Sequence, residues 1–202
     1  PTGSTGVGMY AELAKMNLDF SSVTTFNLDE YYGLEKTHEQ SYWYFMNKNL
    51  YSKVNLKPEN TNIPSGIGES IEEAAHAYDD KIAAKGGIDI MVLGIGNNGH
   101  IGFNEPCEAM DARTHVVTLT DRTIDANARF FEKREDVPTK AVTMGLGSIM
   151  KAKKILMLIS GSNKEKVTRE LLDSFVTTKN PATMLLMHPD VTVLIDEASV
   201  QL

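Results

Sequence analysis

The sequence has very little cysteine: Cys107 is the only one among 202 residues. One cysteine cannot form an internal disulfide, so the chain is no disulfide-stabilised secreted scaffold and fits a reducing cytoplasm. Long apolar runs are also missing, and none approaches the roughly 20 residues that a membrane-spanning helix needs. We therefore expect a cytoplasmic protein with no membrane partner.

Positively charged residues are fewer than negatively charged ones. Lysine and arginine number 20 against 27 aspartate and glutamate, which gives a net charge of −7. Nucleic-acid binding relies on basic patches, so we expect no nucleic-acid partner. The five histidines show no metal-ligand spacing, so no metal site is expected. A phosphorylated small molecule remains compatible, because a phosphate needs only a few local donors.

Apolar runs alternate with helical patterns along the chain, and its length favours a single domain over residues 1–202. This alternation predicts an α/β fold: a doubly wound, mostly parallel, Rossmann-like sheet flanked by helices. The expected strands cover 23–28, 88–93, 115–119, 141–144, 155–159 and 191–195. Helices are expected after residue 5, over 42–50, 71–82 and 164–175, and through 126–130.

The segment from Gly94 to Pro106, GIGNNGHIGFNEP, is the most informative part of the sequence. It follows the apolar run 88–93, and its glycines permit tight turns and close approach of a ligand. His100 and Glu105 form an acid/base pair just past a strand, where α/β sheets carry their sites. The alternative is an ordinary turn with a structural histidine.

This segment resembles the glucosamine-6-phosphate deaminase family, whose members carry GxGxxGHIxFNEP here. Three more stretches resemble the family in the same order: PTGST at 1–5, FNLDEY at 26–31 and NARFF at 127–131. The resemblance covers essentially the whole chain. It also implies a strand before the opening loop, so the 202-residue chain is expected to be truncated at its N-terminus and to lack that first strand.

The resemblance assigns the catalytic roles. Asp29 would be the base that moves a proton between C2 and C1 of the sugar, although the adjacent Glu30 competes for this role and a turn or helix-capping aspartate is the simpler alternative. His100 would open the sugar ring, with Glu105 orienting the imidazole. Asn98 stands where some members have aspartate, so it would orient His100 by hydrogen bonding and not by charge.

The resemblance also assigns a phosphate site. Gly3, Ser4 and Thr5 would offer donors at a helix N-terminus, and Arg129 and Lys164 would supply positive charge. Taken singly, either cation could be a solvated surface charge.

The implied reaction converts glucosamine 6-phosphate and water to fructose 6-phosphate and ammonia, with no cofactor or metal because every step is a proton transfer or an addition. The alternatives are a 6-phosphogluconolactonase-like hydrolase and a non-catalytic sugar-phosphate-sensing domain. The sequence leaves open whether the protein is a monomer or a homo-oligomer.

Overall fold

The structure, a computed structural model, describes residues 1–200 as two compact units. Unit 1 comprises Pro1, residues 79–114 and residues 144–200, and unit 2 comprises residues 2–78 and 115–143. The prediction of one functional domain over 1–202 stays a prediction, and its last two residues lie outside the described range. Within residues 1–200, no helix is both long and apolar enough to cross a bilayer.

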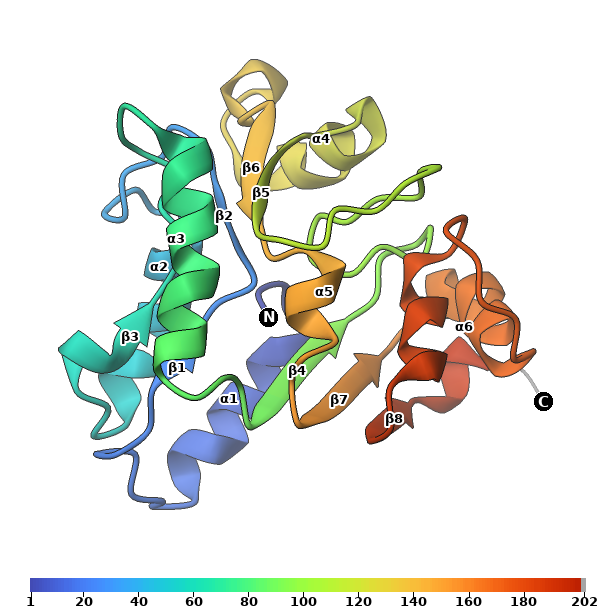
Figure 1. Cartoon of the computed structure of the whole chain (residues 1–202), viewed down its shortest axis with the longest axis horizontal. Coiled ribbons are helices and arrows are strands. Elements are labelled where there is room, and N and C mark those ends of the chain that lie inside the picture. The colour runs from blue at the N-terminus through green and yellow to red at the C-terminus, as the bar shows by residue number, and fades with distance from the viewer. Residues whose placement is uncertain (201–202) are drawn as a thin grey trace. The chain divides into compact units, whose positions relative to one another are not determined.

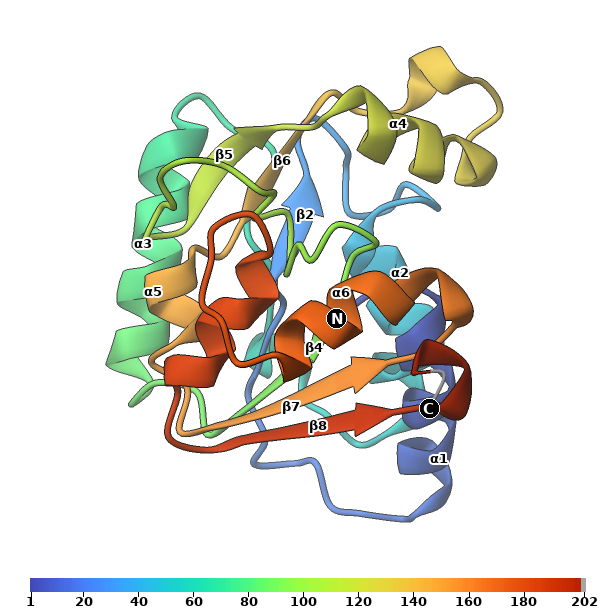
Figure 2. The same cartoon turned by 90° about the vertical axis from the view of Figure 1, so that its right-hand side faces the viewer.

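Unit 1 is built on a parallel sheet of three strands, β4 (Ile90–Gly94), β7 (Lys154–Ile159) and β8 (Val191–Ile195), in the order β4-β7-β8. Figure 2 shows β7 and β8 side by side, pointing the same way. Leu93, Ile155 and Met157 are fully buried and form the centre of its core. These strands confirm the three expected from the apolar runs.

The helices of unit 1 are short. They are α5 (Leu146–Ile149), α6 (Glu165–Leu172) and the 3-10 helices Ser162–Lys164, Pro181–Met187 and Glu197–Ser199. The helix expected over 164–175 ends earlier, because Ser174 adopts a left-handed conformation with φ 62°. Since the three strands are parallel, the loops after β4, β7 and β8 emerge at one edge of the sheet.

Unit 2 contains a second sheet, which is antiparallel. Its strands are β2 (Asp29–Tyr31), β6 (Lys140–Thr143) and β5 (His115–Thr118), in the order β2-β6-β5. A short parallel pair joins β1 (Thr25–Phe26) to β3 (Thr61–Asn62). Of the strand expected over 23–28, only Thr25–Phe26 is a strand, and Asp29, expected just after it, begins the separate strand β2. The pairing direction was not encoded in the sequence pattern.

The helices of unit 2 follow the predicted amphipathic patterns. They are α1 (Ser4–Lys15), α2 (Tyr42–Asn49), α4 (Asp121–Asn127) and the first half of α3 (Ile71–Ala84), whose residues from Asp79 onward belong to unit 1. Short 3-10 helices cover Tyr51–Lys53, Pro58–Asn60, Ala128–Phe130 and Arg134–Asp136. Figure 1 shows α1 to α4 and β4 to β8 with these labels.

Two apolar clusters hold unit 2 together. One joins α1 to α2 and the residues after it, through Tyr10, Met46, Leu50, Tyr51 and Leu56. The other packs Ile71 and Ala75 of α3 on Val142 of β6. The predicted α/β class with parallel sheets and flanking helices is confirmed.

Candidate active site

The loop after β4 folds into two consecutive tight turns in unit 1. Gly99 N donates to Gly96 O at 3.0 Å in the first turn, and Asn104 N donates to Ile101 O at 3.1 Å in the second; Gly96 N also donates to His100 O at 2.8 Å. Gly99 has φ 87°, a conformation that favours glycine. The buried Asn104 side chain donates to the carbonyls of Ile101 and Met144, both at 2.9 Å. The loop is therefore fixed at both ends of the stretch that carries His100.

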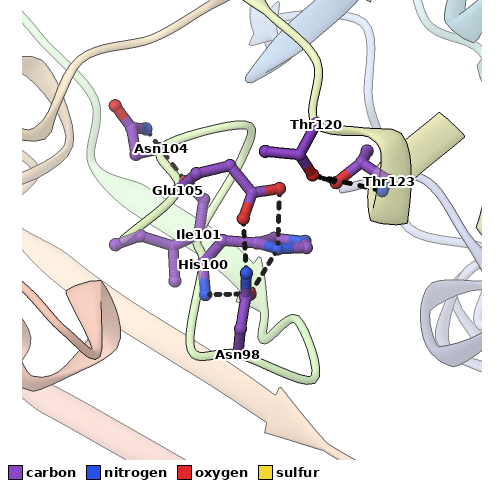
Figure 3. Close-up of polar contacts among 7 residues, drawn as sticks. All are labelled: Asn98, His100, Ile101, Asn104, Glu105, Thr120 and Thr123. Atoms are coloured by element: carbon purple, nitrogen blue, oxygen red, sulfur yellow. Dashed lines mark hydrogen bonds and ion pairs between the residues drawn. The ribbon is translucent and has the colours of Figure 1, made fainter. Parts of the chain in front are cut away.

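His100 lies in a polar network with Asn98 and Glu105 (Figure 3). Its Nδ1 is 2.8 Å from Asn98 Oδ1 and 3.4 Å from Glu105 Oε1. Asn98 Nδ2 in turn donates to Glu105 Oε2. The His100 side chain is 27% exposed and that of Glu105 is 11% exposed, so a ligand can reach the imidazole while the carboxylate is largely shielded.

This network decides which imidazole nitrogen is available for chemistry. Ionised Glu105 can only accept hydrogen bonds, so it orients the Asn98 amide with its NH₂ toward the carboxylate and its oxygen toward His100. His100 Nδ1 then faces two acceptors and carries a proton in either charge state. In the neutral ring Nε2 is therefore the unprotonated nitrogen, which can take a proton from a ligand.

Gly96 packs directly against the His100 ring. A Cβ at position 96 would overlap the imidazole atoms Nδ1, Cε1 and Nε2. Close approach of the backbone to the ring therefore requires glycine here. Similarly, a Cβ at Gly99 would overlap the Oδ1 atom of the fully buried Asn180.

We expect Gly96→Ala to displace the His100 ring and to lower turnover by about tenfold or more, because misplacing a proton-transfer group by even about 1 Å is costly. The measurement is kcat beside the thermal midpoint. Gly94→Ala is the matched control, since a Cβ there meets nothing within 4 Å. Full activity of Gly96→Ala would show that the ring position is not important.

Asp29 is a buried carboxylate at the start of β2 in unit 2, opposite Thr143 of β6. Asp29 is 8% exposed, and its carboxylate forms no hydrogen bond within the described residues 1–200. Burial raises the pKa of Asp29 to about 7, because it outweighs the lowering by the positive charge of the N-terminus, and the negative charge of Glu30 adds a smaller increase. A carboxylate with a near-neutral pKa is suited to take up and release a proton at physiological pH.

Glu30, the competing carboxylate, is committed to a structural role. Its Oε1 accepts from the backbone N–H groups of Tyr31 at 2.8 Å and Tyr42 at 2.9 Å, and its Oε2 accepts from that of Trp43 at 3.1 Å. Two of these donors belong to the first turn of α2, where a negative charge also complements the helix dipole. Of the two neighbours, Glu30 therefore caps α2 and Asp29 remains available for chemistry.

The candidate phosphate residues of unit 2 lie on two segments. Gly3 (φ 93°) precedes α1, and Ser4 and Thr5 form its exposed first turn, which has no acidic residue. The buried Tyr42 hydroxyl forms a hydrogen bond with the Thr2 side chain, which holds this segment in place. Arg129 is exposed on the 3-10 helix Ala128–Phe130, with its guanidinium carbon 4.6 Å from the centre of the Phe130 ring.

Lys164 belongs to unit 1 and stands immediately before α6. The loop in front of it is held by Asp196, which follows β8 and accepts hydrogen bonds from Ser160 Oγ at 2.6 Å and Gly161 N at 3.0 Å. Asn163 Nδ2 also donates to Asn97 Oδ1 at 3.0 Å, which ties this loop to the one after β4. Lys164 and His100 are thus on neighbouring, connected loops.

The predicted residues thus form two groups. Unit 1 brings together Asn98, His100 and Glu105 and carries Lys164; unit 2 carries Asp29, the segment 3–5 and Arg129. Sequence reasoning missed Asp196, since an aspartate after a strand has many uses. Among residues 1–200, no group of three or more histidine, cysteine or acidic side chains is placed to hold a metal ion.

Comparison with known proteins identifies the family. The family model described as glucosamine-6-phosphate isomerases/6-phosphogluconolactonase matches residues 1–194. The chain belongs to this family. Among its relatives, the glucosamine-6-phosphate deaminase of Thermoanaerobacter pseudethanolicus is 56% identical over 100% of this chain and 81% of its own length. That of Clostridium perfringens strain 13 is 53% identical over 100% of this chain and 85% of its own length.

Solved structures agree with this assignment. A monomeric glucosamine-6-phosphate deaminase of the NagB superfamily is 44% identical and superposes with a TM-score of 0.95, covering 98% of this chain and 84% of its own. The 6-phosphogluconolactonase of Thermotoga maritima has a TM-score of 0.73 at 20% identity, covering 96% and 81%, and it shares the fold.

Proposed function

We propose that this protein is a glucosamine-6-phosphate deaminase, which converts glucosamine 6-phosphate and water to fructose 6-phosphate and ammonia. Relatives and a solved structure at 44 to 56% identity carry this activity in their names. The observation that carries the proposal is Asp29, a buried carboxylate with no hydrogen bond within residues 1–200 and a raised pKa. Moving a proton between carbon atoms needs such a base, whereas hydrolysis of a lactone does not.

In this proposal His100 opens the sugar ring. Nε2 of the neutral imidazole takes the proton of the anomeric hydroxyl, and the imidazolium returns a proton to the ring oxygen. Glu105 and Asn98 hold the ring through Nδ1, and the Glu105 carboxylate stabilises the positive charge that forms. The products of this step are the free aldehyde at C1 and the amine at C2.

Asp29 then moves one proton. The carboxylate takes the C2 proton, which is acidic beside the C1 carbonyl, and an enolamine forms. The same group delivers this proton to C1, and the C1 oxygen takes a proton from the C2 nitrogen, which leaves a hydroxyl at C1 and an imine at C2. Water adds to this imine and ammonia departs, so the overall reaction consumes one water and releases one ammonia.

The phosphate group would anchor the substrate during these steps. Arg129 offers a guanidinium suited to two parallel hydrogen bonds with the phosphate. Lys164 supplies a point charge immediately before α6, and residues 3–5 supply the free N–H groups at the start of α1. This protein is proposed to act on glucosamine 6-phosphate as a monomer in the cytoplasm. The monomeric state is supported by the monomeric relative of known structure.

We expect the acid limb of kcat/KM to lie close to pH 7. Asp29 works as a base only when ionised, and burial raises its pKa to about 7. Activity should therefore fall as the pH drops through this value and reach a plateau above it, unless another group titrates. The measurement is kcat/KM between pH 5 and 9, and an acid limb near pH 4, the ordinary range of an aspartate, would contradict the assignment.

Ammonia release and fructose 6-phosphate formation from glucosamine 6-phosphate test the proposal, with 6-phosphogluconolactone as the competing substrate. Equal amounts of ammonia and fructose 6-phosphate support it. Lactone hydrolysis without ammonia release would point to the hydrolase alternative, and binding without turnover of either would point to a sensor.

A further inference from the structure

A long excursion separates the paired strands β5 and β6 of unit 2. The strands pair as far as Thr118 opposite Lys140, and Leu119 N donates to Thr139 O at 2.8 Å. The chain between them contains α4 and two 3-10 helices and carries Arg129 near its middle. In Figures 1 and 2 this excursion extends beyond the ends of β5 and β6.

The excursion is mostly exposed. Arg129 itself is exposed, and the ring that it contacts belongs to the adjacent and also exposed Phe130, so this contact does not fix the segment. Phe131 anchors the chain just beyond it by packing edge-on against Tyr31, with ring centres 5.9 Å apart. A long surface segment samples many conformations unless further contacts tie its parts together.

Arg134 supplies such a tie across the excursion. Its Nε is 2.5 Å from Asp125 Oδ1 and its Nη2 is 2.9 Å from Asp121 Oδ1. Both aspartates lie on α4, before Arg129 in the chain, whereas Arg134 lies after it. One guanidinium therefore closes the segment 121–134 into a loop with Arg129 inside it.

We propose that Arg134 is a positioning residue, whose ion pairs with Asp121 and Asp125 brace the excursion and hold Arg129 where it receives the substrate phosphate. This inference rests on the proposed function through the role of Arg129. Arg134 does not contact the phosphate in this account. It raises the fraction of molecules in which Arg129 is correctly placed, and the apparent affinity scales with that fraction.

Removing the brace should weaken phosphate binding and leave the chemical step nearly unchanged. We expect Arg134→Gln to raise KM for glucosamine 6-phosphate and the dissociation constant of inorganic phosphate by about three- to tenfold, the scale of two exposed ion pairs. The kcat should change less than about twofold. Arg134→Lys should be intermediate, because an ammonium keeps the charge but lacks the fork that reaches both carboxylates.

Arg122→Gln is the matched control, because it also removes one positive charge from the excursion, and Arg122 forms no ion pair within residues 1–200. It should leave KM and phosphate affinity at the parent values. The decisive variant is the double substitution Arg129→Ala with Arg134→Gln. If Arg134 acts only through Arg129, the second substitution adds nothing to the first.

The outcomes separate the two proposals. Independent, multiplicative effects of the two substitutions would refute the positioning role of Arg134 and indicate that Arg134 contacts the phosphate directly. Unchanged phosphate affinity in Arg134→Gln would refute the positioning role as well. Phosphate binding is measured by calorimetry, without turnover. Absence of ammonia release by the unsubstituted protein would instead refute the proposed function.

Discussion

Replacing Asp29 with asparagine is expected to lower kcat by roughly a hundredfold or more, the scale for loss of a general base. Asparagine has nearly the same shape but cannot take the C2 proton, so binding of substrate should be largely retained. The measurement is kcat from ammonia release, with inorganic phosphate affinity measured in parallel. A variant that retains most of the parent rate would remove Asp29 from the mechanism.

Stability provides the control for this variant. The pKa of Asp29 is raised in the folded state, so its stabilising contribution is present at low pH and is lost as the pH rises through about 7. Asparagine never ionises and avoids the cost of burying a charge. We therefore expect Asp29→Asn to unfold at a midpoint at least equal to that of the parent at pH 8, which separates lost chemistry from lost folding.

The second large effect is expected for His100→Gln. Glutamine cannot shuttle a proton between the anomeric hydroxyl and the ring oxygen, so turnover of the cyclic substrate should fall by about a hundredfold or more. An open-chain substrate analogue bypasses this step and should recover a substantial part of the rate. The two substrates are compared on the same preparation.

Equal losses on cyclic and open-chain substrates would contradict the division of roles between His100 and Asp29. Asn98→Asp is a useful companion, because a carboxylate in place of the amide oxygen that faces Nδ1 would stabilise the imidazolium. It keeps the size of the side chain and changes its charge.

Local pattern was a good guide to individual elements. The apolar spacing from residue 71 predicted the helix α3, and the apolar run before Gly94 predicted the buried strand β4. The glycine-rich loop was correctly expected to carry His100 and Glu105 together, since only eight residues and two tight turns separate Gly96 from Glu105. These features depend on neighbours in sequence.

Features that depend on distant pairing could not be predicted. The alternation of elements does not reveal that β2 pairs antiparallel with β6, which is more than a hundred residues away. That pairing and the position of α2 assign Glu30 to the helix terminus and leave Asp29 available. The tie from Arg134 to Asp121 is likewise invisible, because exposed charges carry no periodic signal.

The central claim is that this protein deaminates glucosamine 6-phosphate by moving one proton from C2 to C1 on Asp29. Substrate deuterated at C2 tests this claim most directly, with ammonia and the position of the label followed together. Because Asp29 is 8% exposed, its proton should exchange with water slowly enough for part of the deuterium to reach C1 of fructose 6-phosphate, with a slowed rate. No ammonia release, or ammonia release at an unchanged rate with an aldose 6-phosphate product that still carries the deuterium at C2, would contradict the account.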